Sequence, residues 1–137
     1  MKEEASFGGK ERRQADRPKV RLRARYRLFD EARQQGTGPV DAEAVDLSLL
    51  GLMLRTNEIE TDGVALLPRV GSESGPRVEL ELELDPDRSP LSVTGRVLWL
   101  RLSEDGVVDH KYAAGVVFSY MGERDQDALR SYLERRD

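Results

Sequence analysis

Residues 20–28 read VRLRARYRL, and this stretch decides the fold. Apolar residues alternate with arginines along it, the apolar ones being Val20, Leu22, Ala24, Tyr26 and Leu28. A period of two is typical of a β-strand with one buried face. The run VELELEL at 78–84 repeats the pattern with glutamate as the polar residue. We therefore expect two strands with their apolar faces in one core, and the glutamates as the natural counterpart of the arginines.

The rest of the chain predicts a small mainly β domain. Further strands are expected at about 40–45, 52–55, 91–101 and 111–120, and the run GVALLP at 63–68 allows a short one. The period changes near the end, where residues 123–136 have helical spacing, acidic residues first and arginines last. This order of elements predicts a six- to seven-stranded antiparallel β-barrel with a C-terminal α-helix, formed by residues 19–137.

Composition excludes several classes of site. The 137 residues contain no cysteine and one histidine, His110, so disulfides, thiolate chemistry and multi-histidine metal sites are excluded. No apolar run approaches the roughly 20 residues of a membrane span, and residues 1–13, MKEEASFGGKERR, are polar and lack the apolar segment of a secretory signal, so none is expected. Phosphate-binding glycine loops and hydrolase elbows are lacking as well. We expect a cytoplasmic protein with no membrane span, no catalytic activity, no metal and no cofactor.

The charge is unevenly distributed. The net charge is −4, but residues 10–27 hold nine basic and two acidic residues, so that this segment carries +7 and the remainder −11. Residues 1–18 have no apolar period and are predicted to form a flexible basic arm. A basic segment on an acidic body indicates one local anionic partner, or an ionic match with the body itself.

Two short motifs stand out, each with a plain structural reading. Arg13 and Arg17 form an R-x-x-x-R pattern, which such an arginine-rich chain also produces by chance. Asp46, Ser48 and Gly51 form a D-x-S-x-x-G pattern that occurs once, between two expected strands. A solvated arm explains the first motif, and a turn capped by Asp and Ser, with Gly supplying a positive φ, explains the second. These readings weaken because the motifs occur in order, one before the first strand and one after the second.

This arrangement resembles the PilZ domain, the bacterial receptor module for cyclic di-GMP. RQADR at 13–17 is similar to the family's arginine motif, and DLSLLG at 46–51 to its turn motif. GRVLW at 95–99 is similar to a middle strand. YAAGVVF at 112–118, followed by a helix containing DALRSYL, is similar to the last strand and helix. The resemblance runs from about residue 11 to 135, and Val117 is a mild departure where many members carry a polar or basic residue.

The resemblance implies a ligand site with six contributing residues. These are Arg12, Arg13, Arg17, Asp46, Ser48 and Gly51. The chemistry is consistent, because guanidinium groups pair with phosphates, while a carboxylate or hydroxyl accepts the N–H groups of guanine. An arginine directly before the R-x-x-x-R, here Arg12, is associated in the family with binding two stacked ligands, so two cyclic di-GMP molecules per protomer are expected.

The expected function is a cyclic di-GMP receptor whose arm becomes ordered on the ligand and signals to a partner protein, which the sequence does not identify. One alternative is a PilZ-like adaptor that binds proteins but no nucleotide. Another is a nucleic-acid binder that uses the +7 segment, which the acidic body and the lack of aromatic residues near the arm disfavour.

Overall fold

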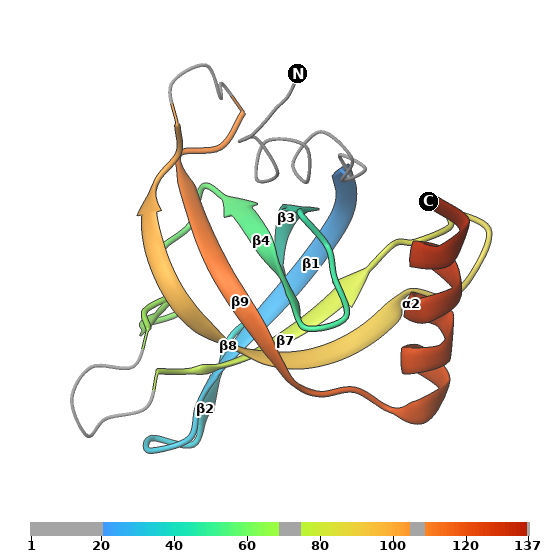
Figure 1. The fold of residues 1–137 in the computed structure, drawn as a ribbon. Coiled ribbons are helices and arrows are strands. Elements are labelled where there is room, and N and C mark those ends of the chain that lie inside the picture. The colour runs from blue at the N-terminus through green and yellow to red at the C-terminus, as the bar shows by residue number, and fades with distance from the viewer. Residues whose placement is uncertain (1–20, 69–74, 105–108, 137) are drawn as a thin grey trace.

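The computed structural model describes residues 21–68, 75–104 and 109–136. Figure 1 shows a β-barrel with a helix at one side. In chain order, the elements of the described part are β1 (Arg21–Asp30), β2 (Gln35–Gly36), β3 (Val40–Val45), β4 (Gly51–Thr56), β5 (Glu60–Thr61), β6 (Val64–Ala65), β7 (Arg77–Leu82), β8 (Leu91–Leu102), β9 (Tyr112–Tyr120) and α2 (Glu123–Arg136). The predicted strands and the C-terminal helix are confirmed.

Six antiparallel strands close the barrel. Their order is β1-β3-β4-β9-β8-β7, and β7 pairs with β1 to complete the ring, while the short β2 extends β1 at its end. The two-residue strands β5 and β6 form a separate hairpin. The predicted six- to seven-stranded barrel is therefore confirmed, and β2 and β5 are additions that the sequence pattern did not indicate.

The apolar alternation of β1 and β7 builds the core. Tyr26, Leu28, Val78, Leu80 and Leu82 are almost completely buried. Helix α2 packs Leu129 into the same core and begins with acidic residues, which suit the positive end of the helix dipole. Among the described residues, Tyr26 and Thr56 form a polar pair inside the barrel.

That polar pair joins Tyr26 to Thr56. The Tyr26 hydroxyl lies 3.0 Å from the Thr56 hydroxyl and donates a hydrogen bond to the Glu58 carbonyl at 3.0 Å. Burial is the main reason that the pKa of Tyr26 is raised above its ordinary value. The two bonds satisfy a hydroxyl that would otherwise be costly to bury.

The arginines of β1 face carboxylates on both neighbouring strands. Arg25 lies opposite Glu81 of β7 and Asp41 of β3, and Arg27 lies opposite Glu79. The predicted register of arginines beside glutamates is thus confirmed. In the described part of the chain, however, the β1 arginines form ion pairs with carboxylates of β3 and not with the glutamates of β7. Arg25 lies 3.5 Å from Asp41, and Arg21 lies 3.9 Å from Glu43. Such exposed pairs contribute only about 0–1 kcal/mol each.

The two halves of the barrel differ in charge. Strands β1, β3 and β7 carry five arginines and five carboxylates. Strands β4, β8 and β9 carry no carboxylate and three arginines, at Arg55, Arg96 and Arg101. The positive and negative charges of β1, β3 and β7 therefore balance. Strands β4, β8 and β9 are mostly apolar and carry a net positive charge.

Candidate functional site

The D-x-S-x-x-G motif forms the connection between β3 and β4. Figure 1 shows it as a loop in front of the barrel, between β1 and β9. Asp46 begins the connection with a φ of 52°, in the left-handed region. Aspartate is one of the few residues other than glycine that adopt this conformation routinely. The predicted turn is confirmed, but its positive φ belongs to Asp46, and Gly51 is not among the left-handed residues.

Ser48 holds the turn together. Its hydroxyl accepts hydrogen bonds from the backbone N–H groups of Leu50 at 3.1 Å and Gly51 at 3.3 Å. The backbone N–H of Ser48 donates to the Gly51 carbonyl at 2.9 Å. A serine hydroxyl that closes a turn in this way has a structural role without any ligand.

Gly51 allows β4 to approach β9 closely. A Cβ atom at this position would overlap the carbonyl oxygen of Val116 and lie 3.2 Å from the Cα of Val117. The preceding carbonyl, that of Leu50, accepts a hydrogen bond from the Phe118 N–H at 2.8 Å. The turn is therefore anchored to β9 at its end, and the lack of a side chain at Gly51 is explained by strand packing.

Asp46 differs from its neighbours in the motif because its side chain has no structural partner. It is exposed, and within residues 21–68, 75–104 and 109–136 its carboxylate takes part in no hydrogen bond or ion pair. A free carboxylate on a braced turn is available to accept hydrogen bonds from a ligand. The left-handed φ of Asp46 favours aspartate or asparagine at this position, but among the described residues its carboxylate has no partner.

Arg12, Arg13 and Arg17 lie outside the described residues. The point where they join the barrel is described, because Arg21 is the first residue of β1 and lies opposite Val45, which directly precedes Asp46. Four residues of chain span at most about 14 Å, which bounds the distance between the Cα atoms of Arg17 and Arg21. The length of the chain therefore allows Arg17 to reach the turn.

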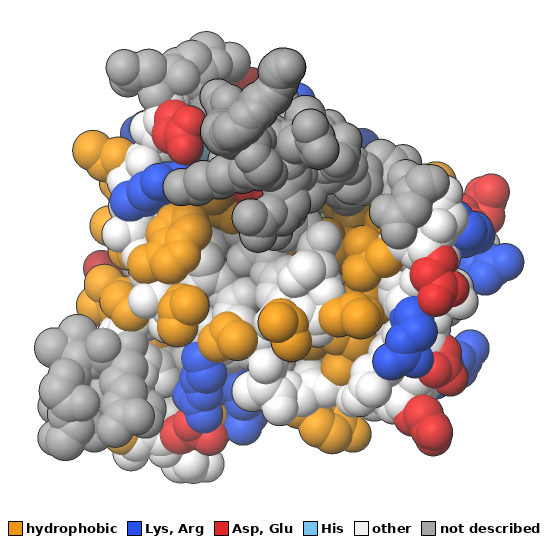
Figure 2. Space-filling model, in the orientation of Figure 1, with side chains coloured by type: hydrophobic (Ala, Val, Ile, Leu, Met, Phe, Trp, Pro, Cys, Tyr) orange, Lys and Arg blue, Asp and Glu red, His pale blue; other side chains and the backbone are white. Residues whose placement is uncertain are grey.

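The surface next to the turn is apolar. Leu50 is 77% exposed, and Val117, which lies opposite Gly51, is 38% exposed. Figure 2 shows hydrophobic side chains in a row across this face of the molecule. Leu50 belongs to the connection before β4, and Val117 belongs to β9, which like β4 and β8 carries no carboxylate.

Trp99 is an exposed residue of β8 that the sequence analysis did not include among the candidate site residues. Its indole lies directly over Gly115, where any side chain would collide with the ring, and it remains 37% exposed. The Arg101 guanidinium lies 4.9 Å from the centre of the ring. The signal was present in the sequence, since 91–102 and 112–120 contain no acidic residue and include the only tryptophan.

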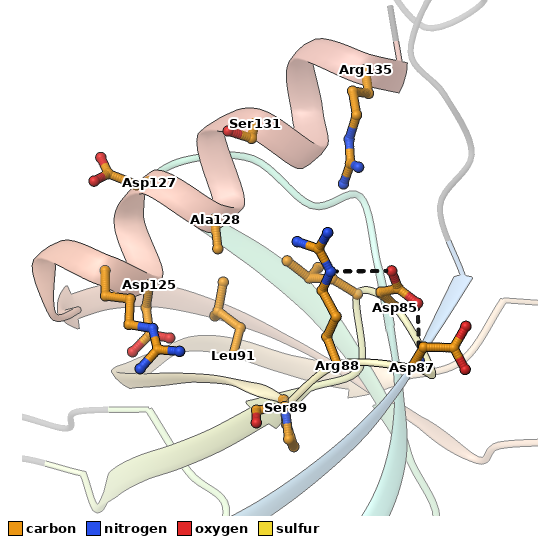
Figure 3. Close-up of a pocket in the computed structure, with 13 residues that line it drawn as sticks. Asp85, Asp87, Arg88, Ser89, Leu91, Asp125, Asp127, Ala128, Ser131 and Arg135 are labelled. Carbon is orange, nitrogen blue, oxygen red and sulfur yellow. Dashed lines mark hydrogen bonds and ion pairs between the residues drawn. The ribbon is translucent and has the colours of Figure 1, made fainter.

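A hollow beside helix α2 fits an anionic ligand poorly. Figure 3 shows it between α2 and the connection from β7 to β8, with carboxylates beside arginines. Arg88 pairs with Asp85 at 3.6 Å, and Asp87, Asp125 and Asp127 also line the space. No residue of the turn contributes to its lining. Four carboxylates against three arginines give no net positive charge to attract a dianion.

Two further properties concern the described residues alone. They contain no cluster of three or more His, Cys, Asp or Glu side chains arranged to hold a metal ion. The single helix described there is too short and too polar to cross a membrane.

Comparisons with known proteins agree with this geometry. The structure is similar to that of the Bacillus subtilis inhibitor of motility MotI/DgrA, with a TM-score of 0.54 and 16% sequence identity over 88% of this chain and 50% of that one. This chain thus spans half the length of MotI. It is also similar to the PilZ domain of YcgR from Escherichia coli, solved with c-di-GMP, with a TM-score of 0.51 and 14% identity over 88% of this chain and 92% of that domain.

At these identities the structural likeness establishes the fold alone. A comparison with curated protein sequences gives no match. The sequence model of the PilZ domain, however, matches residues 11–135, nearly the whole chain. PilZ domains are receptor and adaptor modules that include known receptors of cyclic di-GMP. On this match, which spans both motifs and the barrel, the chain belongs to the PilZ domain family.

Proposed function

We propose that this protein is a bacterial cytoplasmic receptor for cyclic di-GMP, which it binds between its N-terminal arginines and the turn at 46–51. The observation that carries the proposal is the free, exposed carboxylate of Asp46 beside the junction of the arm. Among the described residues, no hydrogen bond or ion pair uses this carboxylate. The comparison with the YcgR domain, solved with c-di-GMP, supports the choice of ligand.

The chemistry of the site matches the ligand group by group. Cyclic di-GMP has two phosphates and two guanine bases. The forked guanidinium groups of Arg13 and Arg17 suit the phosphates, and Asp46 suits the N1–H and N2–H donors of guanine. The exposed side chains of Leu50 and Val117 offer apolar contact to the flat purines, in a half-barrel without carboxylates that would repel a dianion.

The roles of Ser48 and Gly51 follow from their contacts. Ser48 accepts two backbone N–H groups, so its first task is to hold the turn in the shape that presents Asp46. Gly51 allows the same turn to sit against β9. We infer that both act on ligand binding through the geometry of the turn, and that Ser48 can also offer its hydroxyl to guanine.

The decisive test compares two aspartates that share a conformation. Asp46 and Asp62 have φ values of 52° and 51°, and asparagine tolerates this region as well as aspartate does. Asp46→Asn should weaken cyclic di-GMP binding about tenfold by calorimetry, because a charge-assisted hydrogen bond is worth roughly 1–1.5 kcal/mol more than a neutral one. Asp62→Asn should bind like the wild type. Equal affinities for all three proteins would contradict the proposed role of Asp46.

Titration of the wild type separates the alternative functions. An adaptor that binds no nucleotide would give no heat with cyclic di-GMP, and a nucleic-acid binder would respond to a short DNA duplex. For the receptor, Arg13→Ala and Arg17→Ala should each weaken binding by about 2–5 kcal/mol if the phosphate pairs are desolvated. Their melting temperatures without ligand should be unchanged, and a large fall would assign the two arginines to the fold.

We further propose that each protomer binds two cyclic di-GMP molecules, with Arg12 as a third guanidinium for the four phosphate charges. Replacement by an uncharged residue of similar length, Arg12→Met, should lower the stoichiometry towards one and make the salt dependence of binding shallower. Saturation of the wild type at one ligand per protomer would contradict this part. Ordering of the arm on the ligand would then create the surface that a downstream protein recognises.

A further inference from the structure

The second half of β8 has an unpaired edge. Residues 91–96 of β8 pair with β7, and residues 94–102 pair with β9 on the other side. From Leu98 to Leu102 the strand therefore has a neighbour on one side only within the described part of the chain. Figure 1 shows this half of β8 at the outer margin of the sheet.

In the described part of the chain, this edge has little protection against pairing with another strand: it carries one charge, Arg101, and one irregularity, between Val97 and Trp99. Natural sheets protect an edge with proline, with lysine or other charges, or with a covering loop or helix. Residues 98–102 read LWLRL and contain neither proline nor lysine. Leu98 is 65% exposed and Leu102 is 72% exposed, which are among the highest values for large apolar side chains here. Leu98 sits at an irregularity between Val97 and Trp99, which leaves its side chain in solvent.

The sequence of the edge is complementary to itself. When two copies of LWLRL lie antiparallel with Leu100 opposite Leu100, Trp99 of each copy lies opposite Arg101 of the other. Leu98 of each copy then lies beside Leu102 of the other. An arginine over an indole is a favourable contact, and Arg101 already lies 4.9 Å from the ring of Trp99 within one chain.

Neighbouring registers are poorer. Residues that lie directly opposite each other in an antiparallel pair point to the same face, so a shift by one residue would set outward Trp99 against an inward position. A shift that puts Arg101 opposite Arg101 brings like charges together. Arg101 also forms an ion pair with Glu104 at 3.0 Å. Both side chains are exposed, so this pair contributes little stability and does not prevent Arg101 from contacting Trp99 of a second copy.

We propose that a second copy of this chain pairs with the β8 edge at 98–102, antiparallel and centred on Leu100. The contact is isologous, so it closes into a dimer and does not continue into a fibre. It pairs the backbone groups of two edges that have no strand partner in the described part of the chain, and it covers the four exposed leucines. The proposal depends on the β8 edge and not on cyclic di-GMP, so it stands or falls apart from the proposed function.

The first experiment measures the mass of the full-length protein by sedimentation velocity over a range of concentrations, with and without cyclic di-GMP. The wild type should reach twice the monomer mass. Leu102→Lys places a charge on the edge and should remain a monomer. Tyr120→Lys is the matched control, because Tyr120 is 70% exposed but lies on β9 opposite Thr94, away from the edge. This control should form dimers like the wild type.

The second experiment tests the register by cross-linking. The chain has no cysteine, so an introduced cysteine is the only thiol in each variant. In the proposed pairing, residues 98 and 102 of the two copies are close enough for a disulfide. Two copies of residue 98 are separated by about 13 Å along the strands, beyond the roughly 7 Å limit. A mixture of Leu98→Cys and Leu102→Cys proteins should therefore cross-link readily, and each protein alone should not.

Three results would overturn the proposal. If the wild type stays monomeric at all concentrations, a second copy does not pair with this edge. A strand from a different protein would then be the remaining partner. A dimer that survives Leu102→Lys would use another surface. Cross-linking of Leu98→Cys with itself, at the same rate as in the mixture, would contradict the antiparallel register.

Discussion

Replacing Gly51 with alanine should destabilise the barrel, and the structure allows the size of the effect to be estimated. The new Cβ would overlap the carbonyl oxygen of Val116 and lie 3.2 Å from the Cα of Val117. All of these atoms are backbone, so no side chain can rotate away, and β4 must move from β9. Forced overpacking of this kind typically costs about 1–3 kcal/mol.

Alanine also restricts the unfolded chain, which offsets about 0.4–1 kcal/mol of that loss. Taken from the middle of these two ranges, the net destabilisation is about 1–2 kcal/mol. For a domain of this size, each kcal/mol corresponds to roughly 3–5 °C, so the melting temperature should fall by about 3–10 °C. Thermal unfolding followed by circular dichroism, without ligand, measures this directly.

Gly38→Ala is the control. A Cβ there would find its nearest neighbour at 3.7 Å, an ordinary contact with the Asp62 carboxylate, so the melting temperature should hold or rise slightly. If Gly51→Ala melts within about 1 °C of the wild type, the glycine is not needed for the approach of the two strands. Its place in the motif would then have to be explained by contact with the ligand.

Three further predictions concern stability. Tyr26→Phe removes the buried hydroxyl bonded to Thr56 and should lower the free energy of unfolding by about 1–2 kcal/mol in urea at pH 8. In the wild type, burial raises the pKa of Tyr26, so its contribution should persist below pH ~10 and be lost as the pH rises through the folded-state value. Ser48→Ala should lower the melting temperature, because two backbone N–H groups lose their acceptor; unchanged stability would reassign this hydroxyl to the ligand. The hydrogen bond from Arg96 at 2.7 Å lowers the pKa of Glu31, so stability should fall as the pH drops through that lowered value, and Glu31→Gln should weaken this acid dependence.

The sequence predicted the barrel well because its strands alternate strictly. Residues 21–28 and 78–84 each carry one charge type on one face and apolar residues on the other, and that alternation determines which faces of β1 and β7 enter the core. The hairpin of β5 and β6 was harder to predict, since two-residue strands carry no period. Strand β7 ends at Leu82, although the alternation continues to Leu84, because pairing with β8 begins only at Leu91.

The candidate site was predicted less completely, for physical reasons. The spacing of Asp46, Ser48 and Gly51 located the turn, but sequence could not say which of the three takes the left-handed conformation or which side chain remains free. The packing of Gly51 against Val116 joins residues 65 positions apart, and no local pattern reports such a contact. The sequence shows that residues 51–56, 91–102 and 112–120 contain no acidic residue. It does not show that these segments form neighbouring strands, β4, β8 and β9, and so share one surface.

The closure of the barrel through β1 and β7 has a consequence for how the chain folds. Arg25 pairs with Asp41 across 16 residues of chain but with Glu81 across 56. The longer loop costs about 1 kcal/mol more conformational entropy to close, so the β1–β3 hairpin should form first and the β1–β7 seam later. That late seam brings the arginines of β1 towards the glutamates of β7, and their attraction acts over a Debye length that salt shortens. Refolding should therefore slow as ionic strength rises, because salt screens the Arg25–Asp41 pair of the early hairpin and the facing charges of the late seam alike.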